Sequence, residues 1–223
     1  MMRIEKILVV IVVLFVSMLA FGVAHAQAPS ALVLEKSGAS VPEIKPYSEI
    51  PVSTTVSLKS GARLVFLHYH TCQTVTVVAS TITFGAEAYT ITGGKKESET
   101  RSPCPRTVAL KAGGEMGGVL MRSGAAGTIA KFSRQPTFVL VGKRADDFAS
   151  IQVLKDEKSL LEARLDGPRF RWPTNTPPLA GNTDYEMVLI PKVSGAAPVK
   201  MSFFVTVSTE APASEAMVLL RVE

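Results

Sequence analysis

The stretch LHYHTCQTVTVV, residues 67–78, contains two histidines, one cysteine and a run of β-branched residues. Alternate side chains of a β-strand share a face, so one continuous strand would place His68, His70 and Cys72 together. Two imidazoles and a thiolate form a soft ligand set that suits Cu(I) or Zn²⁺. A turn over residues 71–73 would instead break the strand before Cys72 and leave this cysteine to a disulfide. The two interpretations predict different functions.

The N-terminus predicts export. Basic residues precede an apolar run over residues 7–24, and an Ala-His-Ala site ends at Ala26. This order is typical of a secretory signal peptide, which we place at residues 1–26. The expected location is therefore periplasmic or secreted. The apolar run is also close to the roughly 17–25 residues that span a bilayer, so an uncleaved inner-membrane anchor over residues 7–24 is the alternative.

The cysteine count favours a disulfide. Cys72 and Cys104 are the two cysteines of the chain, so a single intramolecular pairing is available. Exported proteins with an even number of cysteines usually oxidise them. The bridge would close a loop of about 30 residues, worth roughly 3–4 kcal/mol by the chain-entropy estimate. We therefore expect a Cys72–Cys104 disulfide, and a metal site of His68, His70 and free Cys72 is its rival.

Short β-branched runs separated by turn residues dominate the rest of the chain. Residues 93–100 contain no apolar anchor and are expected to form a polar loop, whereas residues 159–165 fit either a strand or one turn of helix. The expected strands lie near residues 31–35, 52–58, 63–70, 73–78, 81–84, 87–92, 106–110, 119–122, 137–141, 150–155, 160–165, 169–172, 185–190, 200–207 and 216–222.

This pattern predicts an all-β protein of two domains after the N-terminal signal helix. The first domain is expected over residues 27–125 and the second over residues 135–223. The small residues around Ala126 indicate a linker at residues 126–134. Seven short strands in about 90 residues match a β-sandwich of immunoglobulin or fibronectin type III kind. The single tryptophan, Trp172, is expected in its core, with an exposed carbohydrate-stacking platform as the alternative.

Three segments resemble known exported modules. Residues 56–69 (VSLKSGARLVFLHY) resemble the repeating L-x-x-G-a-x-l-x-l unit of FecR-like domains. Residues 136–141 (PTFVLV) and 179–185 (LAGNTDY) resemble the fibronectin-like domain that often follows such a module. The resemblance implies a FecR-like β domain, then an immunoglobulin- or fibronectin-like sandwich, in an envelope or signalling-linked interaction module. Its motifs are structural, so it implies no active-site residue and no iron binding.

Catalytic motifs are missing from the sequence. We find no G-x-S-x-G elbow, no H-E-x-x-H and no P-loop, and His68 and His70 are the histidines that remain after signal cleavage. The formal charge of +5 is spread along the chain without the dense basic cluster that nucleic-acid binding requires. We therefore expect neither enzymatic activity, nor a cofactor, nor a nucleic-acid partner.

The expected function is non-catalytic binding of a protein or a cell-envelope component through sheet edges and loops. Membrane contact is expected only if residues 7–24 stay uncleaved. One alternative is a periplasmic copper or zinc protein that uses His68, His70 and a free Cys72. Another is an accessory protein or inhibitor of a hydrolase.

Overall fold

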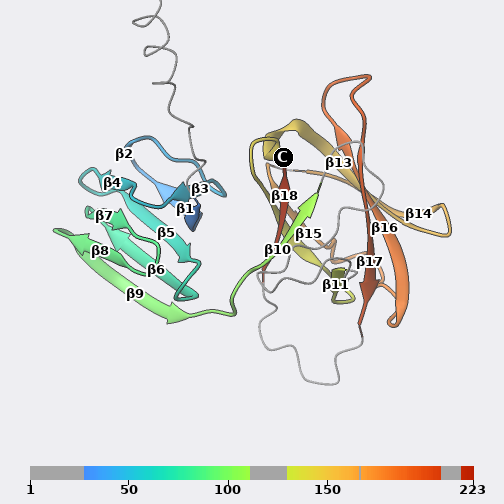
Figure 1. The fold of residues 1–223 in the computed structure, drawn as a ribbon, viewed down its shortest axis with the longest axis horizontal. Helices are drawn as coiled ribbons and strands as arrows, with labels where there is room; N and C mark the ends of the chain where they lie inside the picture. The colour runs from blue at the N-terminus through green and yellow to red at the C-terminus, as the bar shows by residue number, and fades with distance from the viewer. Residues whose placement is uncertain (1–27, 111–129, 166, 207–216) are drawn as a thin grey trace, which may run out of the picture.

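The computed structural model describes residues 28–110, 130–165, 167–206 and 217–223. Apart from one 3-10 turn, η1 (Ala145–Asp147), its regular elements are β-strands. The strands form four sheets that pack in pairs as two β-sandwiches (Figure 1). The all-β class and the β-sandwich architecture predicted from the sequence are confirmed. The expected signal helix lies outside the described residues, and within those residues no helix is long and apolar enough to cross a membrane.

The N-terminal sandwich consists of sheets A and B, in which all strand pairs are antiparallel. Its core contains Phe66 and Phe84, whose rings meet edge to face with centroids 5.0 Å apart. Sheet A has the spatial order β3 (Glu49–Pro51), β1 (Pro29–Ser37), β5 (Arg63–His68), β6 (Gln73–Val78), β9 (Lys95–Arg101). Sheet B has the order β2 (Ser40–Val41), β4 (Thr55–Leu58), β7 (Thr81–Phe84), β8 (Tyr89–Thr92).

The C-terminal sandwich consists of sheets C and D and mixes parallel with antiparallel pairs. Strand β18 runs parallel to both of its neighbours, and β11 runs parallel to β17. Sheet C has the spatial order β10 (Arg106–Leu110), β18 (Val218–Val222), β12 (Thr137–Val141), β15 (Arg169–Arg171). Sheet D has the order β11 (Ala130–Phe132), β17 (Val199–Val205), β16 (Thr183–Pro191), β13 (Phe148–Lys155), β14 (Lys158–Arg164).

Trp172 belongs to the core of the C-terminal sandwich. It is 5% exposed, and its indole N–H donates to the carbonyl of Thr176 at 3.2 Å. The neighbouring Phe170 stacks on Phe138 with ring centroids 4.7 Å apart and meets Trp172 edge to face. The expected core role is confirmed. A carbohydrate platform at this position is wrong, because the ring faces are covered by other core residues.

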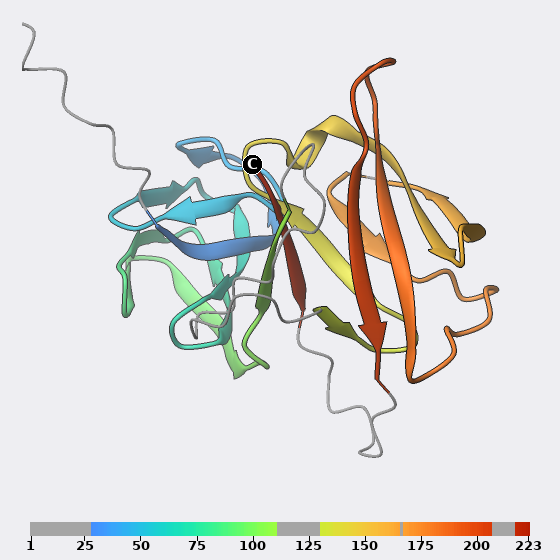
Figure 2. The ribbon, with the colours of Figure 1, turned by 45° about the vertical axis from the view of Figure 1, so that its right-hand side comes forward.

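Sheets A and C pack against each other, so the four sheets are stacked in the order B, A, C, D. In β1, Ala31 and Val33 face sheet B, whereas Leu32 points the opposite way and contacts Val139 and Leu219 of sheet C. Figure 2 shows the strands of sheet A meeting those of sheet C. Each of these two sheets is therefore buried on both faces where they meet.

One strand lies in a different sandwich from the one expected. Residues 106–110 form the expected strand, β10, but it pairs with β18 in register from Arg106↔Val218 to Leu110↔Val222. Their expected place is in the first domain, over residues 27–125. Val108 and Leu110 instead enter the C-terminal core. The sequence separation of more than 100 residues between the paired strands explains why local patterns did not reveal this pairing.

Two local expectations also change, and one open alternative is decided. Residues 95–101, expected in a polar loop, form strand β9, which pairs with β6. Residues 130–132, expected in the linker 126–134, form strand β11. Residues 158–164 form strand β14, which confirms the strand expected near residues 160–165 and excludes its helical alternative. In β9 the backbone ladder stabilises a segment without apolar side chains, whereas β11 buries Ala130 and Phe132 in the C-terminal core. The strand expected at residues 119–122 lies outside the described residues.

The packing of sheet A on sheet C predicts a large effect from a single truncation. Leu219 is fully buried between the sandwiches. We expect Leu219→Ala to lower the free energy of unfolding by about 2–5 kcal/mol, because a Leu→Ala change removes buried area and leaves a cavity. Urea denaturation measures the change. The control is Leu160→Ala at a leucine that is 49% exposed, where we expect about 0.5 kcal/mol or less. Equal effects of the two variants would contradict a shared inter-sandwich core.

Candidate functional site

Residues 67–78 form a hairpin rather than one strand. Strand β5 ends at His68, and β6 begins at Gln73. Between them Cys72 adopts a left-handed backbone conformation, with φ of 53°. The expected alternation holds up to His68, which lies on the core face with Phe66. Beyond the turn the chain reverses direction, so Val75 and Val77 face the same core.

The turn separates the three side chains of the candidate metal site. His68 is fully buried, His70 is exposed, and Cys72 is bonded to Cys104, with Cα atoms 4.8 Å apart. A disulfide has no thiolate to offer to a metal. Within the described residues, no group of three or more His, Cys, Asp or Glu side chains is arranged to hold a metal ion. The predicted Cys72–Cys104 disulfide is present, and in this form the three-ligand set does not assemble.

His68 is held as a neutral side chain inside the N-terminal sandwich. Its Nδ1 accepts the N–H of Thr71 at 3.4 Å and lies 3.1 Å from the Thr71 hydroxyl, so the ring proton belongs on Nε2. Nε2 is buried without a hydrogen-bond partner among the described residues. Burial lowers the pKa of His68 and His70 lowers it further, whereas the Gly85 carbonyl acts in the opposite direction. We therefore expect protonation of His68 to destabilise the turn.

Tyr89 closes the gap between the edges of sheets A and B. Its ring meets those of Phe66 and His68 edge to face, with centroids 5.2 and 5.3 Å away. Its hydroxyl donates to Glu99 on β9 at 2.5 Å, and Glu99 also pairs with Lys96. Burial and the bond to Glu99 raise the pKa of Tyr89 above its ordinary value. The phenol therefore remains a hydrogen-bond donor at neutral pH.

A polar cluster joins the two sandwiches next to the turn. The Glu49 carboxylate accepts hydrogen bonds from the Tyr69 hydroxyl at 2.9 Å and from the Arg221 guanidinium at 2.6 Å. The Glu49 side chain is 13% exposed, and that of Arg221 25% exposed. Burial first, and Glu49 second, raise the pKa of Tyr69. A second polar contact joins the same two sandwiches: the Arg169 guanidinium donates to the Tyr47 hydroxyl at 3.1 Å.

Sequence reasoning missed this cluster. It placed Tyr69 correctly on the face opposite His68, but it did not predict strand β3, which carries Glu49. Arg221 lies 172 positions away from Glu49 along the chain. The usable signal in the sequence is Glu49 beside the apolar Ile50, in a segment rich in turn residues. That signal does not identify Arg221 as the partner of Glu49.

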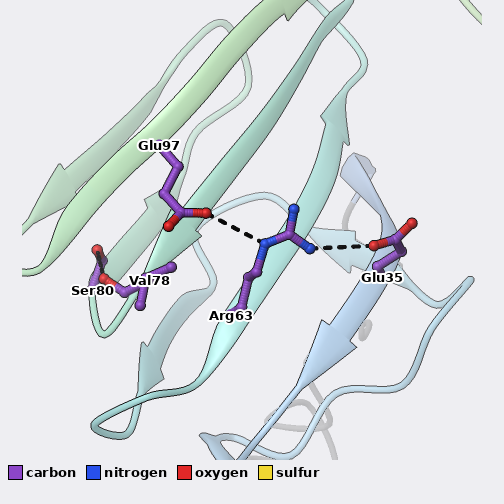
Figure 3. Close-up of polar contacts among 5 residues, drawn as sticks. All are labelled: Glu35, Arg63, Val78, Ser80 and Glu97. Atoms are coloured by element: carbon purple, nitrogen blue, oxygen red, sulfur yellow. Dashed lines mark hydrogen bonds and ion pairs between the residues drawn. The ribbon is translucent and has the colours of Figure 1, made fainter.

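At the opposite end of sheet A, Arg63 forms a surface ion-pair ladder. It reaches Glu35 on β1 at 3.3 Å and extends across β6 to Glu97 on β9 at 3.4 Å (Figure 3). Nearby, the Ser80 hydroxyl donates to the carbonyl of Val78 at 2.8 Å. The Arg63 side chain is 42% exposed, so solvent screens both pairs. The ladder aligns strands β1, β5 and β9 and carries no chemistry of its own.

The free edges of the four sheets differ in how they are protected. Strands β2, β3, β11 and β15 are two or three residues long. Strand β9 is charged at five of its seven positions, β14 contains a bulge and three charges, and β10 begins with Arg106. Strand β8, with the sequence YTIT, has four residues, no charge and an unbroken register with β7. Among the described edges, β8 is the one best suited to accept another strand.

Comparisons with known proteins do not assign this chain to a family. A scan against protein-family models, a search of curated proteins and a search of solved structures each found no match.

The disulfide leads to a quantitative stability prediction. Replacing both cysteines by serine, as Cys72→Ser with Cys104→Ser, should lower the free energy of unfolding by about 3–4 kcal/mol, because the bridge closes a loop of 32 residues. Guanidinium denaturation of the oxidised protein and of the double variant measures the difference. A loss below about 1 kcal/mol would show that the bridge does not restrict the unfolded chain as the entropy argument requires.

The buried His68 leads to a pH prediction. Its folded pKa lies below the unfolded value near 6.5, so the folded state resists protonation that the unfolded state accepts. The contribution of His68 to the free energy of unfolding is therefore constant above about pH 6.5. It falls toward pH 5, by at most about 1.4 kcal/mol per pH unit. We expect His68→Phe to flatten this slope in urea titrations between pH 7 and pH 5. An unchanged slope would assign the acid sensitivity to another group.

Proposed function

We propose that this protein is an exported, non-catalytic binding module that recruits an extended segment of a partner protein to the free edge of β8. The observation that supports the proposal most directly is the lack of protection at β8. The other described edges of four or more residues contain charges, and one of them also has a bulge. Sheet edges without such protection accept added strands through main-chain hydrogen bonds.

The side chains of β8 suit strand addition. Tyr89 and Ile91 point toward the core of the N-terminal sandwich and remain half-buried, because no further strand covers them. Thr90 and Thr92 are exposed on the opposite face. An added strand would extend the backbone ladder and bury more of the surface of Ile91. A partner segment with alternating apolar and polar residues fits this pattern.

Export and family relationship belong to the same proposal. The disulfide supports an oxidising compartment such as the periplasm. In the C-terminal sandwich, the Tyr185 hydroxyl contacts the backbone of Ala180, accepting its N–H at 2.9 Å. A tyrosine hydroxyl that hydrogen-bonds to the backbone a few residues upstream is a feature of immunoglobulin-like sandwiches. It supports the proposed immunoglobulin- or fibronectin-like character. The FecR-like character of the first domain rests on residues 56–69.

The test places charge on the proposed edge. We expect the double variant Thr90→Lys with Thr92→Lys to lose a partner that the wild type captures from the envelope fraction of its own cells, because lysines block strand addition. The control is Thr83→Lys, which adds charge to the same exposed face one strand further in. Crosslinking followed by mass spectrometry identifies the partner.

The outcomes separate the alternatives. Loss of capture in the edge variant alone supports binding at β8. Equal loss in both variants would place binding on the face of sheet B, and equal retention would place it elsewhere in the molecule. A wild-type protein that captures nothing would contradict the binding function.

A further inference from the structure

The Cys72–Cys104 disulfide joins two different environments. Cys72 is 5% exposed in the turn between β5 and β6, whereas Cys104 is exposed. Cys104 lies in residues 102–105, which connect β9 of the N-terminal sandwich to β10 of the C-terminal sandwich (Figure 1). The disulfide therefore holds the crossover between the two sandwiches.

The remaining attachments of the crossover lie on either side of Cys104. Before it, the Ser102 amide donates to the Cys72 carbonyl at 2.8 Å, and the Ser102 hydroxyl lies 2.7 Å from that of Thr74. After it, the Arg106 amide donates to the carbonyl of Met217 at 3.0 Å. The prolines on both sides of Cys104 have no amide N–H to donate. The covalent bond is thus the main attachment of Cys104 itself.

We propose that this disulfide is a thiol-exchange site whose redox state sets how firmly the crossover is held. An external thiolate attacks Sγ of Cys104, an exposed residue, the S–S bond breaks, and its electron pair leaves on Cys72 Sγ, which then takes up a proton. A second thiolate attacks the outer sulfur of the mixed disulfide and releases Cys104 as a thiolate. Two external thiols are oxidised to one disulfide, and the protein disulfide is reduced to two thiols. Exposed disulfides are the ones that exchange readily.

The reduced form keeps the sandwiches together. The contacts of Leu219 and the Glu49–Arg221 ion pair do not involve either cysteine. Reduction therefore frees the crossover locally. Arg101 ends β9 opposite Gln73, so trypsin cleavage after Arg101 requires opening at this end of the strand. Such cleavage reports directly on the state of the crossover.

The first experiment identifies the sulfur that is attacked. The folded, oxidised protein is treated with reduced glutathione, the free thiols are alkylated, and peptides are mapped by mass spectrometry. We expect glutathione on Cys104 and the alkyl group on Cys72. Glutathione on Cys72, or exchange only after addition of denaturant, would overturn the proposal.

The second experiment measures the opening of the crossover. We expect trypsin to cleave after Arg101 about tenfold faster or more in protein reduced with dithiothreitol than in oxidised protein, because cleavage follows the population of the locally opened form. The double variant Cys72→Ser with Cys104→Ser should match the reduced protein without any thiol present. If this variant does not fold, the dithiothreitol-treated wild type still provides the comparison.

Fluorescence of Trp172, buried in the C-terminal sandwich, distinguishes local opening from unfolding. A single early cleavage with native fluorescence supports the proposal. Equal cleavage rates in the two redox forms, or degradation to small peptides as the native fluorescence is lost, would overturn it.

Discussion

The contact between sheets A and C is the constraint on which the rest of the structure depends. Leu32 of β1 meets Val139 and Leu219 across this boundary, and each strand also turns alternate side chains into its own sandwich core. Two sheets that are covered on both faces cannot shift independently without exposing apolar surface. The four-layer stack therefore fixes the position of the neighbouring polar groups. The Glu49–Arg221 pair forms because its two strands are already held against each other.

The turn after β5 concentrates several connections in a few residues. His68 bonds the turn from inside the N-terminal sandwich, Tyr69 bonds Glu49 at the boundary, and Cys72 holds the crossover that leads to β10. The histidine and the cysteine that suggested a metal site are thus both used structurally. Because the histidine is buried neutral and the cysteine pair is open to thiols at one end, the same turn responds to acid and to reductant.

The distribution of charge over the sheet edges separates structural edges from the proposed binding edge. Charges on β9 keep a long edge soluble while its ladder with β6 completes sheet A. Tyr89 at the start of β8 closes the sandwich through Glu99, so that β8 is anchored from inside while its outer backbone groups stay free. An edge anchored in this way suits the addition of a partner strand.

The sequence by itself determined the fold class, most strand positions and the disulfide. Alternation of side chains places Phe66 and His68 on one face of their strand and Tyr69 on the other, because strand period is a local property. With two cysteines, one pairing was available. Only the tertiary structure decided that residues 106–110 belong to the C-terminal sandwich and that residues 95–101 form a strand.

The same division applies to the candidate site. Arg221 lies 172 positions from Glu49, and β18 lies more than 100 positions from β10 along the chain. Alternation says which way a side chain points but not which strand it meets. The YTIT segment could be predicted as a strand, but its position at a sheet edge depends on how many neighbours it has. Such pairings are set by how the sheets bury one another, which is a property of the whole chain.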